Sequence, residues 1–123
     1  MKGFLLKIWL KGERSNYNNV LSVLEYNPNA VVLDCGCGNG EFTLRAASKI
    51  GVREIFGIEI DEELANVAKA KGIKVKQADL NKKIPFDDAS FDVVIANQLI
   101  EHLFDTDNFV DEIYRILRRG GTQ

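Results

Sequence analysis

The stretch "LDCGCGNGEF", residues 33–42, decides the fold, because three alternating glycines join a hydrophobic run to a helix-like segment. The run "AVVLDC" predicts a buried strand, and residues 42–50 predict a helix. A tight turn alone needs one flexible residue, whereas Gly36, Gly38 and Gly40 together also let a ligand approach the backbone closely. Ligands of α/β proteins bind beyond the carboxyl ends of the strands, so we expect this turn to hold a ligand.

Strand-like and helix-like segments alternate through the rest of the chain. Asp61 can cap a helix that Gly72 closes, and Asp107 can cap the last helix, which stops at Gly120. We expect strands at residues 30–35, 53–60, 73–77 and 91–96, with helices at 42–50, 61–72 and 107–120. Strands that are hydrophobic almost throughout form parallel sheets covered by helices on both faces. The predicted fold class is therefore α/β, a three-layer sandwich with a mainly parallel sheet.

The predicted helices carry hydrophobic faces at helical spacing. In the helix after Asp61, the shared face consists of Leu64, Val67 and Ala68. In the last helix, the inward residues are Phe109, Val110, Ile113, Ile116 and Leu117.

The first 29 residues are predicted to form an N-terminal helical segment ahead of a domain that spans residues 30–123. One helix-like piece covers residues 4–10. A second piece, "SNYNNVLSVLEY", places Tyr17, Val20, Leu21 and Leu24 on one face, and Pro28 breaks the pattern.

Composition limits the classes of protein that fit. The chain has 123 residues, 46% of them hydrophobic and 28% charged, with a net charge of −2, which suits one soluble domain. This balance indicates against nucleic-acid or membrane partners, and no hydrophobic run is long enough to span a membrane. Cys35 and Cys37 are too close in one loop to pair, and His102 is the only histidine, so no metal site is predicted. These features, with no signal-peptide pattern at the start, predict a cytoplasmic protein.

The chemistry of the glycine loop favours a cationic ligand. The dinucleotide fingerprint G-x-G-x-x-G fails here, because Gly36 and Gly38 are followed by Gly40 and then Glu41. The carboxylates of Asp34 and Glu41 would repel a pyrophosphate and attract a cation. S-adenosylmethionine (SAM) carries a sulfonium and an ammonium group, so it suits a loop flanked by these two carboxylates. An NAD-type nucleotide-binding domain is the alternative.

Four segments in order resemble the class I SAM-dependent methyltransferases, in particular their small-molecule group. They are "VLDCGCGNG", "GIEID", "QADLNKKIPFDDASFDVVIAN" and "ILRRGG", and together they cover about residues 30–121. The resemblance implies a Rossmann-like fold and SAM as the cofactor. The family's sheet continues with a fifth strand, so the resemblance also implies a domain truncated after the fourth strand and its helix.

Residue chemistry and the resemblance together predict the cofactor site. Glu59 ends the second strand about 20 residues past the glycine loop, where a carboxylate can accept hydrogen bonds from both ribose hydroxyls. The resemblance implies that Asp79 and the Leu80 N–H bind adenine and that Asp34 reaches the ammonium group through water. It also implies that Asn97 offers a backbone carbonyl to that group. The predicted cofactor-binding residues are Asp34, Gly36, Cys37, Gly38, Gly40, Glu59, Ile60, Asp79, Leu80 and Asn97.

The stretch "NQLIEHL" carries the candidates for catalysis. Methyl transfer needs mainly an aligned acceptor and the exclusion of water, and a general base helps when the acceptor is a hydroxyl or an ammonium group. His102 and Glu101 are candidates for that role, and the alternative is that His102 packs against the sheet. The stretch also resembles a Glu-x-x-Glu-His metal motif, but Gln98 replaces its first glutamate and the chain has no second histidine.

Three functions therefore remain open from the sequence. The first is methyl transfer from SAM to a small-molecule acceptor, the second is a non-catalytic SAM-binding module that pairs with another chain, and the third is the NAD-type domain. The strand at residues 91–96 is expected to lie at an open sheet edge, which invites a homodimer or a partner chain. Alternatively, the N-terminal segment could cover the sheet and bury Trp9.

Overall fold

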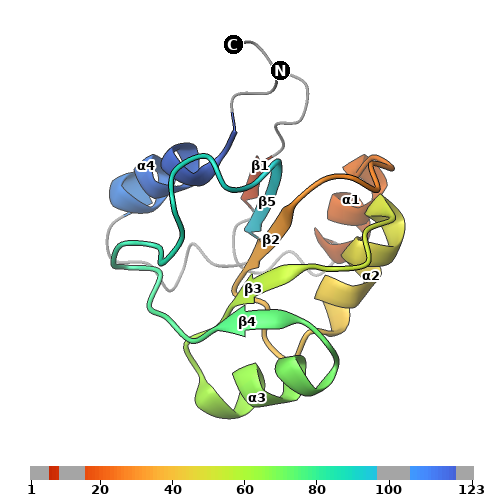
Figure 1. Ribbon diagram of the computed structural model, residues 1–123, viewed down its shortest axis with the longest axis horizontal. Helices are drawn as coiled ribbons and strands as arrows, with labels where there is room; N and C mark the ends of the chain where they lie inside the picture. Colours follow the sequence, from red (N-terminus) through yellow and green to blue (C-terminus); the bar gives the residue numbers. More distant parts are fainter. Residues whose placement is uncertain (1–5, 9–15, 97–105, 119–123) are drawn as a thin grey trace.

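The computed structural model describes residues 6–8, 16–96 and 106–118, which fold around one parallel sheet (Figure 1). The described strands lie in the order β1-β5-β2-β3-β4, and every pairing between neighbours is parallel. The strands are β1 (Leu6–Ile8), β2 (Val32–Cys35), β3 (Phe56–Ile58), β4 (Lys74–Lys76) and β5 (Val93–Ala96). The helices are α1 (Asn16–Val23), α2 (Glu41–Ile50), α3 (Glu62–Ala70) and α4 (Thr106–Ile116). None of these helices is long and hydrophobic enough to cross a membrane.

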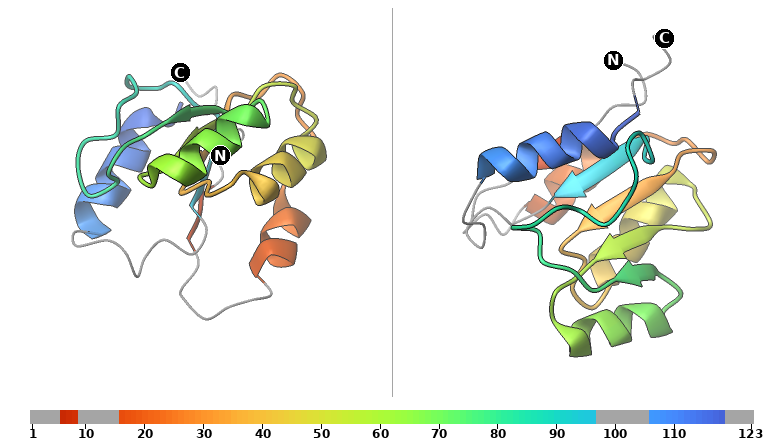
Figure 2. Two further views of the ribbon diagram at one scale, coloured as in Figure 1. Left: turned by 90° about the horizontal axis from the view of Figure 1, so that it is seen from below. Right: turned by 60° about the vertical axis from the view of Figure 1, so that its left-hand side comes forward.

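Helices cover both faces of the sheet, which confirms the predicted three-layer α/β sandwich (Figures 1 and 2). One hydrophobic cluster joins α1, α2 and α3 to one face, with Val32 and Ile95 as members from the sheet. The other cluster joins α4 to the opposite face, where Leu33 and Val94 belong to it. Successive residues of β2 and β5 therefore point into opposite cores, as strand geometry requires.

The predicted helix after Asp61 is confirmed, but most of its expected inner face is not buried. The Asp61 side chain caps α3 by accepting a hydrogen bond from the Leu64 N–H at 2.9 Å. Ala68 is buried as expected, whereas Leu64 and Val67 are 39% and 45% exposed. The buried residues of α3 are instead Ala65 and Ala68, so the inner face is rotated from the predicted one. A Cβ at Gly40 would lie 3.3 Å from the Ala68 Cβ, which leaves room only for small side chains on this face.

The last helix begins one residue before its expected cap, so Asp107 lies in the first turn of α4. Its buried side chains are Phe109, Ile113 and Ile116, and Leu117 is buried just after the helix ends. Val110 is only partly buried. The expected inward face is thus confirmed at four of its five positions.

The N-terminal segment corrects the prediction, because Leu6–Ile8 form a strand rather than part of a helix. Strand β1 pairs in parallel with β5 along Val94–Ala96. A short hydrophobic run suits a helix or a buried strand equally well, and the unpaired backbone groups of β5 favour the strand. The expectation that β5 forms an open sheet edge is therefore wrong, and a second chain is not needed to cover it. Trp9 lies outside the described residues, and a homodimer stays a prediction.

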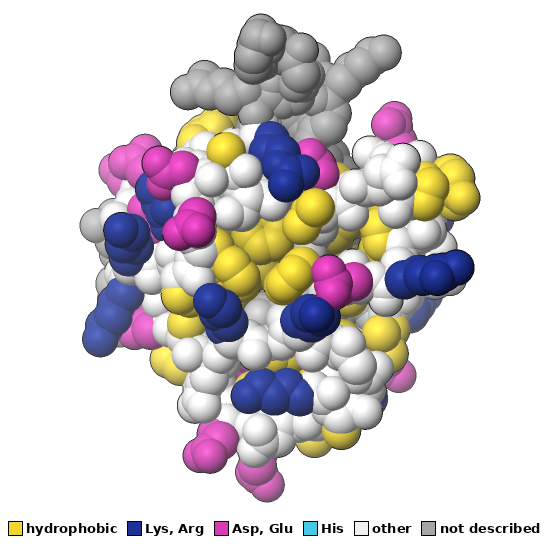
Figure 3. Space-filling view, in the orientation of Figure 1, with side chains coloured by type: hydrophobic (Ala, Val, Ile, Leu, Met, Phe, Trp, Pro, Cys, Tyr) yellow, Lys and Arg dark blue, Asp and Glu magenta, His cyan; other side chains and the backbone are white. Residues whose placement is uncertain are grey.

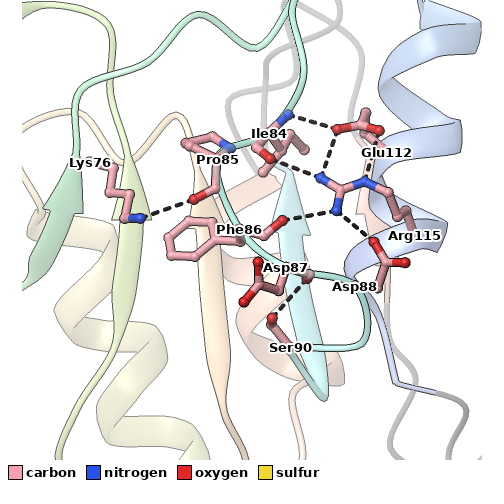
Figure 4. A network of polar contacts seen from close by, with 9 residues as sticks. All are labelled: Lys76, Ile84, Pro85, Phe86, Asp87, Asp88, Ser90, Glu112 and Arg115. Carbon is pink, nitrogen blue, oxygen red and sulfur yellow. Dashed lines mark hydrogen bonds and ion pairs between the residues drawn. The ribbon is translucent and has the colours of Figure 1, made fainter.

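An arginine on α4 holds the long loop between β4 and β5 in place (Figure 4). The Arg115 guanidinium donates to the carbonyl oxygens of Ile84 and Phe86, at 2.8 and 2.9 Å, and to the carboxylates of Glu112 and Asp88. Glu112 also accepts the Ile84 N–H at 2.7 Å. Hydrogen bonds from Arg115 lower the pKa of Glu112, so this carboxylate is ionised at neutral pH. All five N–H donors of Arg115 are thereby engaged.

Aromatic rings support the same loop from the other side. The rings of Phe56, Phe86 and Phe91 meet edge to face, with centroids 4.9 to 6.1 Å apart. The Lys76 ammonium lies 4.6 Å from the centroid of the Phe86 ring and donates to the Pro85 carbonyl oxygen. Hydrophobic side chains gather near the middle of this view of the surface, with lysine and arginine side chains around them (Figure 3).

We expect Arg115→Lys to lower the free energy of unfolding by about 1–3 kcal/mol, because a lysine cannot serve two carbonyls and two carboxylates at once. Arg118→Lys is the matched control, since the Arg118 side chain is 46% exposed and its ion pair with Asp92 should contribute less than about 1 kcal/mol. Urea denaturation of the three proteins measures both effects. The difference in the free energy of unfolding between the wild type and Arg115→Lys should shrink as the pH falls through the lowered pKa of Glu112. Protonation then removes the carboxylate charge that Arg115 binds. Equal losses of unfolding free energy in Arg115→Lys and Arg118→Lys would show that Arg115 does not hold the loop in place.

Candidate cofactor site

The glycine loop connects the end of β2 to the start of α2, and backbone hydrogen bonds tie it to the end of β3. The N–H groups of Gly36 and Cys37 both donate to the Ile58 carbonyl oxygen, at 2.8 and 3.0 Å. Gly36, Gly38 and Gly40 have φ angles of 75°, 56° and 90°, in the left-handed region that disfavours other residues. The loop therefore takes a shape that side chains would strain, directly beyond the carboxyl ends of two neighbouring strands.

Two of these glycines meet quite different surroundings. A Cβ at Gly40 would lie 2.4 Å from the Ile73 Cδ1, so Gly40 permits the close packing of the loop on the core. Among the described residues beyond its two chain neighbours, no atom would lie within 4 Å of a Cβ at Gly38. Gly38 thus borders open space, as a position that contacts a ligand should.

The Glu59 carboxylate links the loop to the start of α3. Its Oε1 accepts the Gly38 N–H at 2.9 Å, and its Oε2 accepts the Asp61 N–H at 3.1 Å. A carboxylate has about four acceptor positions, so both oxygens can accept further hydrogen bonds. Glu59 is therefore fixed beside the open space at Gly38 with capacity for a ligand's hydroxyl groups. Ribose binding by Glu59 stays a prediction.

Asp34 is almost completely buried beneath the loop, with 2% of its surface exposed. Its Oδ2 accepts a hydrogen bond from the Thr43 hydroxyl at 2.6 Å. Burial raises the pKa of Asp34 to about 7, the Thr43 hydrogen bond opposes this shift, and the negative charge of Glu59 adds to it. The contact expected between Asp34 and an ammonium group stays a prediction.

The sequence analysis missed Thr43, which lies on the buried face of α2. Its signal was a hydroxyl residue at a fully buried position of a helix that is otherwise packed through Phe42, Ala46, Ala47 and Ile50. Buried hydroxyls need a hydrogen-bond partner, and Asp34 is the nearby acceptor.

Cys37 faces the core rather than the open space. Its side chain is buried, and a Cβ at Gly57 would lie 2.8 Å from its sulfur. Burial raises the pKa of Cys37 to about 12, so its thiol stays protonated. Both cysteines are free, as predicted. Cys37 can therefore contact a cofactor through its backbone, not through its sulfur.

The end of β4 and the residue after Glu59 form the second part of the candidate site. The Asp79 Oδ1 accepts hydrogen bonds from the backbone N–H and the side-chain amide of Asn81, at 2.9 and 3.1 Å. Leu80 is partly buried, and Ile60 is 59% exposed. The Gln77 side chain, which the sequence analysis also missed, donates to the Ile60 carbonyl oxygen at 3.0 Å. An acidic group and exposed hydrophobic surface thus lie on the β3–β4 side of the glycine loop.

The remaining predicted site residues, Asn97, Glu101 and His102, lie outside the described residues, as does Gln98. Strand β5 ends at Ala96, which is in register with Cys35 of β2. Within the described residues, no group of three or more histidine, cysteine, aspartate or glutamate side chains could hold a metal ion.

The fold and this loop define the class of a Rossmann-like cofactor-binding domain. A family model described as a methyltransferase domain matches residues 33–123, and the chain belongs to that family. The resemblance to SAM-dependent methyltransferases, and SAM as the cofactor of that family, are therefore confirmed. The match favours the methyltransferase interpretation over the NAD-type alternative.

Named relatives agree with this assignment. A probable S-adenosylmethionine-dependent methyltransferase of Mycolicibacterium smegmatis is 37% identical over 92 residues, which are 73% of this chain and 35% of that protein. The 27-O-demethylrifamycin SV methyltransferase of Amycolatopsis mediterranei is 35% identical over 100 residues, 73% of this chain and 35% of that protein.

The fold also matches solved methyltransferase structures. One match is a chain in the solved complex of the Haloferax volcanii Trm112 methyltransferase activator with a methyltransferase. The match covers 85% of this chain and 47% of that chain. The TM-score is 0.76, with 26% identity. The chain thus spans about a third to a half of the length of these similar proteins.

We expect Gly38→Ala to weaken SAM binding at least tenfold while changing stability by only about 1–2 kcal/mol. The new methyl group would strain the backbone and point into the open space that the cofactor needs. Gly72→Ala is the matched control, because Gly72 also has a positive φ of 96° and no atom within 4 Å of its missing Cβ. Calorimetric titration with SAM, beside thermal unfolding, compares the two variants. Equal affinity in both would show that Gly38 does not border the cofactor.

Proposed function

We propose that this chain provides the SAM-binding part of a methyltransferase that acts on a small-molecule acceptor. The observation that carries the proposal is the Glu59 carboxylate, which is fixed by the Gly38 and Asp61 N–H groups beside the open space at Gly38. A carboxylate held in this way can accept both hydroxyls of a ribose. Membership of the methyltransferase family identifies SAM as the ligand that this arrangement suits.

The described residues would bind and orient the cofactor. Glu59 would hold the ribose, Asp79 and the Leu80 N–H would bind adenine, and the exposed Ile60 side chain would cover its ring. Asp34, beneath the loop, would supply negative charge for the ammonium group. When bound, SAM supplies an electrophilic methyl group, so the protein's main contribution is alignment and the exclusion of water.

The acceptor side of the proposal rests on relatives and on the sequence. The rifamycin methyltransferase acts on a small molecule by its name, which supports an acceptor of that size for this chain. His102, with Glu101 beside it, would remove a proton from a hydroxyl or ammonium acceptor. No resident metal is part of this proposal. The two free thiols suit a reducing compartment, and we place the protein in the cytoplasm.

A second candidate function is a SAM-binding module that works by pairing with another chain. The similar Haloferax volcanii methyltransferase was solved with an activator chain, and this observation favours keeping the candidate. A homodimer is the other form that pairing could take. Turnover of an acceptor by this chain alone would favour the enzyme over the module.

We expect Glu59→Ala to weaken SAM binding by about one to two orders of magnitude, because it removes hydrogen bonds to a charged group. Glu62→Ala, which removes one exposed carboxylate from the first turn of α3, is the matched control and should bind SAM normally. Titration calorimetry of both variants with SAM and with NAD measures the effect. Wild-type affinity in a folded Glu59→Ala protein would remove the ribose assignment, and tighter binding of NAD than of SAM would overturn the proposed function.

If His102 is the general base, His102→Ala should lower turnover by about 10²–10⁴ and leave SAM affinity nearly unchanged. The measurement is methyl release with a panel of small hydroxyl and amine acceptors, followed by SAM titration of the same protein. Normal turnover in a folded His102→Ala variant would return His102 to a packing role. Stimulation of the wild type by Mg²⁺ that Gln98→Ala abolishes would contradict the prediction that no metal takes part.

A further inference from the structure

We propose that Thr43 is a positioning residue for Asp34, and that SAM binding is coupled to the release of a proton from this buried carboxyl group. The inference rests on the proposed function, because it takes SAM as the ligand. It goes further by assigning a role to a residue inside α2 and a proton to the binding step.

The first support is the isolation of Asp34 from solvent. Asp34 is 2% exposed and Thr43 is fully buried, so water cannot stabilise a charge there. Among the described residues, the Thr43 hydroxyl donates a hydrogen bond to the Asp34 side chain. In the part of the chain that the structure describes, no lysine or arginine forms an ion pair with Asp34. One neutral donor is too little to hold a buried carboxylate fully ionised.

The second support is the charge around Asp34. Glu59, at the end of the neighbouring strand β3, repels a negative charge on Asp34. Burial raises the pKa values of the Cys35 and Cys37 thiols, so they stay neutral and add no further negative charge beside Asp34. These effects give Asp34 a pKa of about 7, and the carboxyl group is about half protonated at that pH before a ligand binds.

A cationic ligand supplies the missing charge. SAM carries a sulfonium and an ammonium group, and a positive charge near Asp34 favours its ionised form. The O–H bond of the Asp34 carboxyl group then breaks, its electron pair stays on the carboxylate, and the proton passes to solvent. By linkage, a ligand that lowers this pKa binds more weakly as the pH falls below 7.

Thr43 sets which oxygen is left for the ligand. Its hydroxyl donates to Oδ2 at 2.6 Å, so the proton that is lost comes from Oδ1. The same hydrogen bond favours the ionised form and holds the pKa of Asp34 below the value that burial alone would give. Replacing the hydroxyl with a methyl group of the same size removes both effects without opening a cavity.

Proton release can be measured directly by titration calorimetry of the full chain with SAM at pH 6, in two buffers of different ionisation enthalpy. At this pH the cofactor's own amino group is fully protonated and contributes nothing. With a pKa of about 7 in the free protein, we expect about 0.9 proton released per SAM bound. SAM affinity should be about fivefold weaker at pH 6 than at pH 7.

Variants identify the residue that releases the proton. Asp34→Asn should release none, whereas Glu62→Gln, which neutralises an exposed carboxylate in the first turn of α3, should behave as the wild type. Thr43→Val should release more protons at pH 7 than the wild type, because the pKa of Asp34 rises, and Thr43→Ser should restore the wild-type value. A Thr43 with only a packing role would leave this proton count unchanged.

The outcomes separate this inference from the proposed function. SAM binding by the wild type without proton release at pH 6 overturns the inference alone, and this result needs no variant to fold. Proton release that persists in Asp34→Asn or disappears in Glu62→Gln also overturns it. An absence of SAM binding at both pH values overturns the proposed function together with the inference.

Discussion

The rest of the candidate site depends on the two backbone hydrogen bonds between the glycine loop and the end of β3. One carbonyl oxygen, that of Ile58, accepts the N–H groups of both Gly36 and Cys37. This forces the loop to turn immediately after β2, which only residues with positive φ allow. The turn then aims the Gly38 N–H at the Glu59 carboxylate and brings Gly40 against Ile73. The open space at Gly38, the position of the Glu59 carboxylate and the start of α2 all follow from this one backbone contact.

The same contact concentrates negative charge in a small volume. Asp34 is buried under the glycine loop, and a hydrogen bond from the Gly38 N–H holds the Glu59 carboxylate at the edge of the loop. Backbone N–H groups offset the charge of Glu59, whereas Asp34 has mainly the Thr43 hydroxyl among the described residues. A folded protein keeps such an arrangement at a cost in stability, and functional sites are where that cost is commonly found. The charges make sense if the usual occupant is a cation.

The sequence predicted the central strands and the glycine loop well, because both depend on local patterns. Hydrophobic runs, the glycine spacing and the Asp61 cap are visible without tertiary information, and the structure has each of them. Long-range effects were not visible. The strand Leu6–Ile8 forms through pairing with β5, nearly 90 residues away along the chain, and a helical spacing pattern cannot show that. Likewise, Thr43 and Gln77 form their hydrogen bonds with partners on other elements, and a sequence does not show those partners.

Strand order explains why the site has two sides. The chain leaves β2 toward β3 and β4 on one side, while β5 lies on the other side of β2. A reversal of this kind opens a crevice beyond the carboxyl ends of the strands, here between β2 and β5. Glu59, Ile60 and Asp79 all follow strands on the β3 side, so the residues proposed to bind the cofactor gather there. Strand β5 ends at Ala96, in register with Cys35, on the opposite side of β2 from those groups. Under the proposed function, a methyl acceptor would approach from the β5 side and meet the cofactor across the switch point.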